Sequence, residues 1–570
     1  MPKRIPSKTS DFRTLIRDNG YYVDKTHFIE KLEIISDKYL FFLRPRRFGK
    51  SLFLSVLEYY YGIQYKNEFE SLFGEYYIGG QPTPLKNEYY ILKFEFSGIN
   101  PDSVSGGRDS FNLKVKAGIR AFSQNYGFFT APELEEIINK PFPSEILIEF
   151  FSRLGYYNLE KSVYILIDEY DHFTNELFLF SSESFSETVT GDGWLRKFYE
   201  VIKDYCSKGL IDRFFATGVT PVTLDSLTSG FNIAYNITMH PAFHELAGFT
   251  QSEMQEMLEA INVNTPSVST THSIYNDLRD WYNGSKFSES SQLRLYNPQL
   301  IINFLSKFTS LGKYPDEMTD YSIISDRKKI AQILDKLPSE MGESIIEELY
   351  INESISGGLT LQFIPELPYS KSDAISLLFY NGLITIDKMT AGIYRYVIPN
   401  YVIKEIYWEY LRIQYDLKYN LKLDLNYLND VFTEMAFEGT INNLVKKVSD
   451  VMQILSNNDF RSFNESSLKM IVISVLSANS IFMIHSEAGV SSGRVDLLLT
   501  RNKAYDARFQ YLFEFKYVRV KDEKDFEAVK NEGIEQIKRY RESRELESED
   551  NLKSYLILFH NKFEGVITEV

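Results

Sequence analysis

The sequence predicts a multidomain α/β protein. At 570 residues, the chain is longer than one hydrophobic core usually supports. In the first half, short apolar segments alternate with helical patterns, as in a parallel sheet that helices cover on both faces. In the last third, a helix, several strands, another helix and a final strand follow one another, which is typical of a second compact α/β domain.

The composition is that of a globular protein whose surface is not basic as a whole. Hydrophobic residues make up 44% of the chain and charged residues 25%, both ordinary values. The net charge of -16 argues against a surface covered with phosphate contacts, although a local basic groove remains compatible with it. Cys206 is the single cysteine, which excludes an intramolecular disulfide and a multi-cysteine zinc site and favours a reducing compartment.

No segment predicts secretion or membrane insertion. The first residues include Lys3 and Arg4, but no apolar run follows them as it would in a secretory signal. The most apolar stretch, residues 470–484, is too short to span a bilayer and contains Ser and Asn. We therefore expect a cytoplasmic protein without a membrane partner.

The first predicted domain, residues 1–250, is built on four buried strands. These strands are residues 39–43, 89–96, 163–171 and 213–219. The first strand runs into the loop RPRRFG, and apolar residues at helical spacing follow from Lys50 on. Strand, loop and helix in this order are the context that a phosphate-binding loop requires. The serine-rich residues 181–193 predict a mobile loop between helices.

The phosphate-loop motif ends in Gly49, Lys50 and Ser51. The glycine allows the backbone to approach the phosphates, the lysine bridges β and γ oxygens, and the serine hydroxyl binds Mg²⁺. The helix that begins at Lys50 also directs its free backbone amides and the positive end of its dipole at the phosphates.

The beginning of this loop departs from the usual G-x-x-x-x-G-K-[ST] pattern, because Arg44 stands where the first glycine is expected. Pro45 fixes its own φ and favours an extended Arg44, so the loop can be shaped without that glycine. Arg46 and Arg47 would then add positive charge near the phosphates, and a solvated position for both side chains is the alternative.

Two further strands deliver polar residues at their ends. Asp168 and Glu169 follow an apolar run, where the first would hold Mg²⁺ through water and the second would orient the attacking water as general base. Thr217 ends the next strand and could sense the γ-phosphate. A neighbouring chain could complete the site with an arginine, which would require a homo-oligomer, but spacing does not decide among the candidates. These candidates are Arg46, Arg47, Arg196 and Arg213.

These motifs together resemble the bacterial AAA-ATPase-like family, whose members carry RPRRFGKS and LIDEYD. The likeness continues through YYVDKTHFIEKL, FATGVTPV, ELAGFTQSEM, WYNGSKF and LYNP. It implies a P-loop ATPase core that uses ATP and Mg²⁺, with Lys50, Ser51, Asp168 and Glu169 at the matching positions.

Residues 251–422 predict a helical lid with a winged-helix-like end. A capped helix begins near residue 250, more helices follow to about residue 350, and residues 373–400 predict a helix with a small hairpin. A plain structural connector is an equally good interpretation of this region.

The third predicted domain, residues 423–570, places acidic residues on neighbouring strands. Asp496 lies on the strand 493–501, and Glu514 and Lys516 share one face of the next strand. Two carboxylates that bind Mg²⁺ and a lysine that positions water would suit phosphodiester hydrolysis.

Four more residues could support this site. Glu487 and the helix residue Glu465 could add metal ligands or outer contacts, and Gln536 and Tyr540 share one face of a later helix. An isolated edge-strand ion pair between Glu514 and Lys516 is the alternative interpretation.

The pattern GRVDLLL, EFK and QI resembles the PD-(D/E)XK nuclease superfamily over about the last 110 residues. The resemblance implies a restriction-endonuclease-like fold that cleaves DNA or RNA. A nucleotide-controlled scaffold with an inactive nuclease fold, which binds nucleic acid or protein, is the alternative, and the acidic net charge favours it. A third possibility is an ATPase whose last domain binds other proteins.

Overall fold

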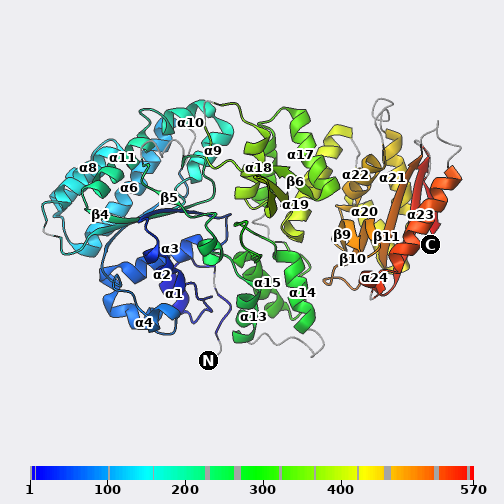
Figure 1. The fold of residues 1–570 in the computed structure, drawn as a ribbon, viewed down its shortest axis with the longest axis horizontal. Coiled ribbons are helices and arrows are strands. Elements are labelled where there is room, and N and C mark those ends of the chain that lie inside the picture. The colour runs from blue at the N-terminus through cyan, green and yellow to red at the C-terminus, as the bar shows by residue number, and fades with distance from the viewer. Residues whose placement is uncertain are drawn as a thin grey trace. The chain divides into compact units, whose positions relative to one another are not determined.

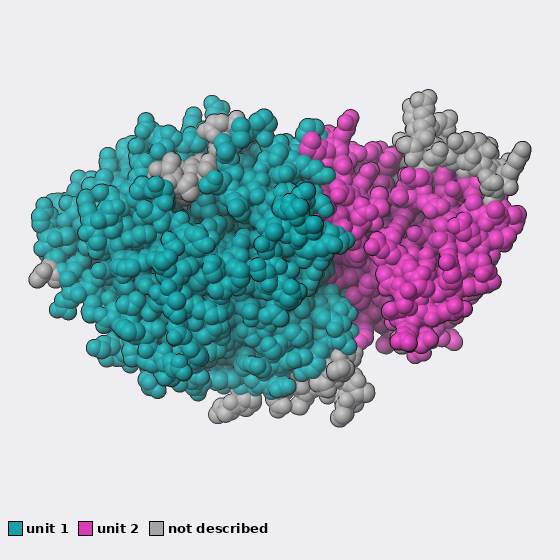
Figure 2. All heavy atoms as spheres, in the orientation of Figure 1, with its two compact units in different colours: residues 1–306, 332–338, 356–400 teal, residues 307–331, 339–355, 401–570 magenta. Residues whose placement is uncertain are grey.

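The structure of the protein is a computed structural model. It describes residues 3–6, 8–99, 103–157, 159–224, 231–261, 271–319, 324–364, 367–419, 423–454, 464–518, 526–547, 549–560 and 565–570. Figure 2 colours two compact units, which we describe separately. Unit 1 comprises residues 1–306, 332–338 and 356–400, and unit 2 comprises residues 307–331, 339–355 and 401–570. The three-part division at residues 250 and 422 stays a prediction, because one compact unit can hold more than one domain.

Helices and strands alternate through the first part of the chain. They are α1 (Phe12–Arg17), α2 (His27–Ile34), β1 (Tyr39–Leu43), α3 (Lys50–Tyr61), η1 (Ile63–Glu68), α4 (Phe69–Phe73), α5 (Tyr77–Gly80), β2 (Tyr90–Glu95), α6 (Val104–Tyr126), α7 (Ala131–Ile138), α8 (Pro143–Leu154), β3 (Val163–Asp168), α9 (His172–Phe180), α10 (Ser182–Val189), α11 (Trp194–Ser207), β4 (Ile211–Gly218), β5 (Tyr235–Asn236), η2 (Pro241–Leu246), α13 (Gln251–Ala260), α14 (Thr271–Tyr282) and α15 (Pro298–Leu311).

The later elements include two more sheets. They are α16 (Ile324–Leu334), α17 (Ser339–Asn352), β6 (Ser354–Gly357), α18 (Lys371–Tyr380), β7 (Thr385–Thr390), β8 (Ile393–Val397), α19 (Tyr401–Tyr419), α20 (Leu425–Glu438), α21 (Asn442–Ile454), α22 (Glu465–Leu476), β9 (Phe482–Val490), β10 (Gly493–Arg501), β11 (Gln510–Val518), α23 (Phe526–Arg541), α24 (Arg544–Glu547), β12 (Leu552–His560) and β13 (Val566–Glu569).

The sheet of unit 1 has five parallel strands in the order β2-β3-β4-β1-β5. Helices α6, α8 and α11 cover one face, and α3 with the N-terminal helices covers the other (Figure 1). Strand β4 separates β1, which leads into the phosphate loop, from β3, which ends at Asp168. The carboxyl ends of all these strands lie at one edge, so this edge collects the polar residues that the sequence places there. The predicted parallel sheet is confirmed.

The predicted mobile loop at residues 181–193 is wrong, because most of it forms helix α10. The side chain of Ser181 accepts a hydrogen bond from the amide of Ser184 and caps the helix. Phe185 and Val189, four residues apart, are both buried. This one-turn spacing of apolar residues outweighs the loop signal of the serines.

The hairpin predicted between residues 373 and 400 is present. Helix α18 is followed by β7 and β8, which pair in antiparallel fashion within a three-stranded sheet of order β6-β8-β7. The likeness of this region to a winged helix stays a prediction.

Unit 2 contains the second large sheet, in the order β13-β12-β11-β10-β9. Strands β9, β10 and β11 are antiparallel neighbours, whereas β11 and β12 run parallel. Helices α22 and α23 both contact β11 (Figure 1). The order α22, β9, β10, β11, α23, β12 along the chain is the compact α/β arrangement that the sequence predicts.

Within the parts of the chain described above, no helix is both long and apolar enough to cross a membrane.

Candidate functional sites

The phosphate loop joins β1 to α3 through two residues with positive φ. Gly49 caps α3 with φ of 93°, which glycine adopts without a steric penalty. Arg47 has φ of 70°, a left-handed conformation that is uncommon for a residue with a side chain. The loop is therefore held in a fixed, partly strained shape at the start of the helix.

Lys50 lies inside this loop. Its ammonium group donates hydrogen bonds to the carbonyl oxygens of Arg44 and Pro45, at 2.9 Å and 3.0 Å. Burial lowers the pKa of Lys50 to about 8, although nearby carboxylates, Asp168 first among them, oppose this shift. A buried ammonium that only loop carbonyls hold is well placed to exchange these partners for phosphate oxygens.

The side chain of Arg44 does not line the cavity in which we expect the phosphates. Its side chain is 1% exposed, and its guanidinium donates to the carbonyl oxygens of Leu43, Thr238, Phe243 and His244 at 2.8 to 3.1 Å. The rings of Phe42 and Phe287 lie 4.5 Å and 4.4 Å from its central carbon. Burial lowers the pKa of this guanidinium to about 9. The side chain at the position of the missing glycine is thus a buried support of the loop.

Asp168 and Thr217 meet at the carboxyl edge of the sheet. The hydroxyl of Thr217 donates a hydrogen bond to Asp168 Oδ1, and both side chains are buried. This bond fixes the orientation of the carboxylate. The two residues that the sequence placed on separate strands are therefore brought together.

Glu169 follows Asp168 with φ of 54°, again left-handed. Its Oε2 is buried and has no hydrogen-bond partner among the described residues, and His172 Nε2 lies 4.0 Å away. A buried carboxylate oxygen without a partner is costly, and it marks a place for a water molecule or a ligand. Glu169 also lines the cavity beside the phosphate loop.

Asp171 has a structural role that the sequence did not assign. Its carboxylate accepts hydrogen bonds from the amides of Val219 and Thr220, at 3.1 Å and 2.6 Å, and from Asn175 Nδ2 at 2.7 Å. These bonds connect the segments that follow β3 and β4. They join the ends of the two strands that carry Asp168 and Thr217.

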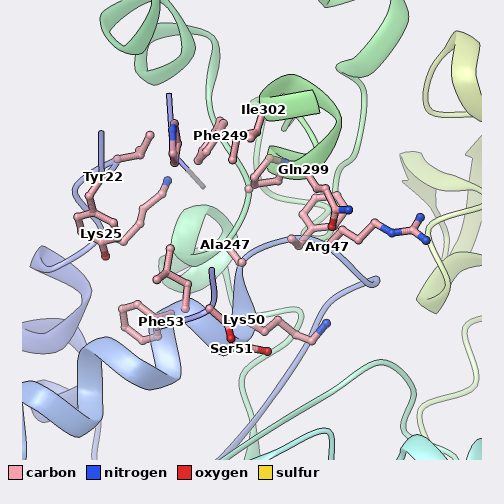
Figure 3. Close-up of a pocket in the computed structure, with 18 of the residues that line it drawn as sticks. Tyr22, Lys25, Arg47, Lys50, Ser51, Phe53, Ala247, Phe249, Gln299 and Ile302 are labelled. Atoms are coloured by element: carbon pink, nitrogen blue, oxygen red, sulfur yellow. The ribbon is translucent and has the colours of Figure 1, made fainter. Parts of the chain in front are cut away.

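A cavity of about 370 Å³ opens from the phosphate loop. Arg46, Arg47, Gly49, Lys50 and Ser51 form one side of it. Figure 3 shows the other walls, which come from the N-terminal segment, from the segment around Phe249 and from the start of α15. Sequence reasoning assigned no role to several wall residues. Tyr22, Val23, Phe249 and Pro298 lie in the family motifs quoted above, whereas Gln299 and Ile302 lie outside them. Only the fold brings these distant segments together.

The four arginine candidates have different surroundings. Arg46 and Arg47 line the cavity, and the carbonyl oxygen of Arg46 accepts a bond from Asn297 Nδ2 at 3.5 Å. Arg196 pairs with Glu200 on α11 at 3.1 Å. Arg213 is buried and donates to the carbonyl oxygen of Leu32. A buried Arg213 cannot reach the phosphates of a neighbouring chain.

In unit 2, Asp496 and Glu514 stand side by side on β10 and β11, because Leu497 pairs with Phe513. Asp496 Oδ2 accepts a hydrogen bond from the amide of Phe515 at 2.9 Å. Burial raises the pKa of both carboxyl groups, that of Glu514 to about 7, and their mutual repulsion adds to the shift of Glu514. A buried Glu514 and a half-buried Asp496 that repel each other form a site that a cation would stabilise.

Lys516 joins this pair to helix α22. Its ammonium group lies 3.1 Å from Glu514 Oε1 and 3.9 Å from Glu465 Oε2. Burial opposes the charge of Lys516, but Glu514 and Glu465 outweigh this effect, so the net pKa of the lysine is raised. Burial also raises the pKa of Glu465. The structure thus places Glu465 next to the predicted site.

Glu487 and Tyr540 approach from two other elements. Glu487 on β9 pairs with Lys469 of α22, a residue that sequence reasoning missed because no motif marks it. Tyr540 on α23 is 7% exposed and interacts electrostatically with Glu514 and Asp496.

Gln536 and Gly493 complete the surroundings of the acidic pair. Gln536 Oε1 is buried without a hydrogen-bond partner in the described parts of the chain. Gly493 has φ of 150°, and a Cβ there would lie 3.1 Å from the ring of Tyr540. Glycine therefore allows the turn before β10 to pack against this tyrosine.

The acidic pair fits a divalent metal ion in its chemistry. Glu514 Oε2 is buried and has no hydrogen-bond partner among the described residues, so a ligand oxygen is available. No cluster of three or more His, Cys, Asp or Glu side chains suited to a metal occurs in the described ranges. Mg²⁺ commonly uses one or two carboxylates and keeps several waters, so two acids suffice.

Two family comparisons agree with this geometry. Residues 6–228 match a family described as "Predicted AAA-ATPase", and residues 463–569 match the PD-(D/E)XK nuclease superfamily. The protein is therefore an α/β protein with an N-terminal AAA-ATPase-like domain and a C-terminal domain of the PD-(D/E)XK nuclease superfamily. Both predicted resemblances are confirmed.

Among individual proteins, the chain is similar to one from Azotobacter chroococcum mcd 1, named "Uncharacterized protein in vnfD 5'region". The two are 27% identical over 302 residues, which is 52% of this chain and 50% of that protein. The chain thus matches about half the length of this relative.

Proposed function

We propose that the protein binds and hydrolyses ATP with Mg²⁺ at the phosphate loop. The observation that carries this proposal is the position of buried Lys50 at the edge of a cavity that Glu169 also lines. The cavity volume of about 370 Å³ lies within the usual range for small-molecule sites, roughly 300–1,000 Å³. The apolar wall residues Val23, Phe249 and Ile302 suit a nucleobase.

Each residue of this site has a proposed role. The ammonium of Lys50 and the amides at the start of α3 bind phosphate oxygens, and Arg46 and Arg47 add positive charge. The Ser51 hydroxyl would bind Mg²⁺, and the Asp168 carboxylate would hold it through water. The Asp168 carboxylate is oriented by Thr217, and Glu169 accepts a proton from the attacking water.

Lys50→Ala is expected to reduce ATP turnover by at least about 100-fold, because the charge on the transferred phosphoryl group loses its lysine. Lys208→Ala, which removes an exposed lysine paired with Asp204, is the matched control and should leave turnover unchanged. Phosphate release measures both. Turnover that survives Lys50→Ala unchanged would show that the phosphate loop is assigned wrongly.

We further propose that the C-terminal domain cleaves DNA or RNA. Asp496 and Glu514 would bind the metal, and Lys516 would position the attacking water or offset charge in the transition state. Mg²⁺ bound at that pair supplies a Lewis acid for the phosphodiester and an activated water. Glu465 and Glu487 would hold this arrangement, and Gln536 and Tyr540 would face the site from α23.

Asp496→Ala is expected to abolish cleavage, because one of the two metal ligands is lost. Purified protein with Mg²⁺ or Mn²⁺ and mixed single- and double-stranded DNA and RNA would test this on gels. Asp506→Ala, on the loop after β10, is a control that should cut like the wild type. Retained binding without cleavage by the wild type would instead support the second candidate, a nucleotide-controlled scaffold, which the net charge of -16 favours.

We also propose how the nuclease is controlled, in which oligomeric state the protein acts and in which compartment it is found. ATP binding or hydrolysis would control the nuclease, since both sites belong to one chain. A homo-oligomer would allow an arginine that does not line the chain's own cavity, such as Arg196, to act on a neighbouring chain. The cytoplasm is the proposed compartment, because a single buried cysteine suits a reducing environment.

A further inference from the structure

Lys469 is a buried lysine next to the nuclease-like site that none of the proposed catalytic steps uses. It lies on α22, is 6% exposed, and forms an ion pair with Glu487 of β9. It also interacts electrostatically with Asp496. A lysine so deeply buried is held by its charged partners, because desolvation of an ammonium group is unfavourable.

The partner, Glu487, belongs to a row of acidic residues across three strands. Ser486 pairs with Leu497 and Ala488 with Val495, so Glu487 stands opposite Asp496. Asp496 in turn stands beside Glu514. Glu487 has φ of 51°, which is unusual within a strand and indicates that its position is imposed by its surroundings.

The charged groups nearest to the acidic pair carry a net negative charge. Two ammonium groups, those of Lys469 and Lys516, face four carboxylates, so two negative charges remain when all groups are ionised. The four acids are Glu465, Glu487, Asp496 and Glu514. One divalent cation neutralises this remainder, whereas a second would leave an excess of positive charge in a buried site.

We propose that the ammonium group of Lys469 takes the place of a second divalent cation, so that the nuclease-like site binds a single metal ion at Asp496 and Glu514. Lys469 is then a positioning residue that keeps Glu487 away from the metal. This inference rests on the proposed metal site. It explains why Glu487 does not join Asp496 and Glu514 in a three-carboxylate cluster. It also leaves Lys516, which lies 3.1 Å from Glu514 Oε1, as the group that would position water.

The number of bound Mn²⁺ ions tests the proposal. Isothermal titration of the full chain without nucleotide counts the ions, and only those lost in Asp496→Asn are assigned to this site. We expect one such ion in the wild type and two in Lys469→Met, because Glu487 is then free to bind metal. The double variant Lys469→Met with Glu487→Gln should return to one ion.

Lys538→Met is the matched control. It breaks an exposed lysine pair with Glu535 on α23 and should keep one ion. If circular dichroism shows that Lys469→Met does not fold, the variant Glu487→Gln tests the proposal instead. This variant must retain the ion, because Glu487 is not a ligand in the proposed site.

Four results would overturn the proposal, and they are distinguishable. Two ions in the wild type, or one in a folded Lys469→Met, would disprove the role of Lys469 alone. Loss of the ion in Glu487→Gln would make Glu487 a ligand. Absence of any ion that depends on Asp496 would disprove the metal site itself, and the proposed nuclease with it.

Discussion

Arg44 connects the phosphate loop to the segment that follows β5. Its guanidinium satisfies carbonyl oxygens of Thr238, Phe243 and His244 and lies between two aromatic rings. The same residue leaves its own carbonyl oxygen to Lys50. An arginine at the position of the first glycine therefore anchors the phosphate loop to the segment after β5. The left-handed residues Arg47 and Gly49 define the remaining shape of the loop.

Arg44→Lys is expected to destabilise unit 1 by roughly 2 to 3 kcal/mol, because a lysine cannot donate to several carbonyls in one plane and leaves some unpaired. The thermal transition of unit 1, identified by its shift on adding ATP, measures the effect. Arg47→Lys, which keeps a charge at the cavity, should leave that transition nearly unchanged. Equal effects of the two variants would contradict the supporting role of Arg44.

At the scale of elements, helix α19 carries a half-buried acid, Glu405. Burial raises its pKa to about 8 from an ordinary value of 4.5, with Glu409 adding to the shift and Arg327 opposing it. Lys404, its neighbour on α19, pairs with Glu353. The folded protein therefore keeps the proton of Glu405 between these two pH values, whereas the unfolded chain releases it.

Because the folded state binds this proton more tightly, the contribution of Glu405 to stability falls as the pH rises from about 4.5 to about 8. Glu405→Gln cannot ionise, so its thermal midpoint relative to the wild type should be higher at about pH 8.5 than at about pH 5. Scanning calorimetry at both values measures this difference. Midpoints that shift in parallel in both proteins would show that Glu405 is not the titrating group.

The strands and their end residues could be predicted from the sequence to a large extent. An apolar run that ends in Asp168 marks β3, an apolar strand that carries Asp496 marks β10, and the phosphate loop marks the start of α3. Alternation along β11 predicted the closeness of Glu514 and Lys516, which lie 3.1 Å apart. Such signals are local, because each depends on neighbours in the chain.

Contacts between distant segments could not be predicted in this way. Nothing in the pattern around Arg44 shows that its side chain turns towards Thr238. The same holds for Lys469, whose partner is Glu487, and for the cavity wall at Pro298 and Gln299. These positions depend on how strands and helices pack, and a single sequence contains no periodic signal for that.

At the scale of the whole molecule, an AAA-ATPase-like domain and a nuclease-superfamily domain share one chain. Control of one by the other requires that nucleotide change the free-energy difference between two states of the nuclease site. Each site has its own variant that removes it, Lys50→Ala for the first and Asp496→Ala for the second. The two activities can thus be separated in the full chain.

Cleavage of labelled DNA and RNA by the full chain, with Mg²⁺ and with ATP, ADP or no nucleotide, tests the central claim most directly. We expect the wild type to cut at a rate that depends on the nucleotide. Asp496→Ala should not cut under any condition, and Lys50→Ala should cut at one rate whatever the nucleotide. Cleavage that persists in Asp496→Ala, or a wild type that never cuts, would contradict the account.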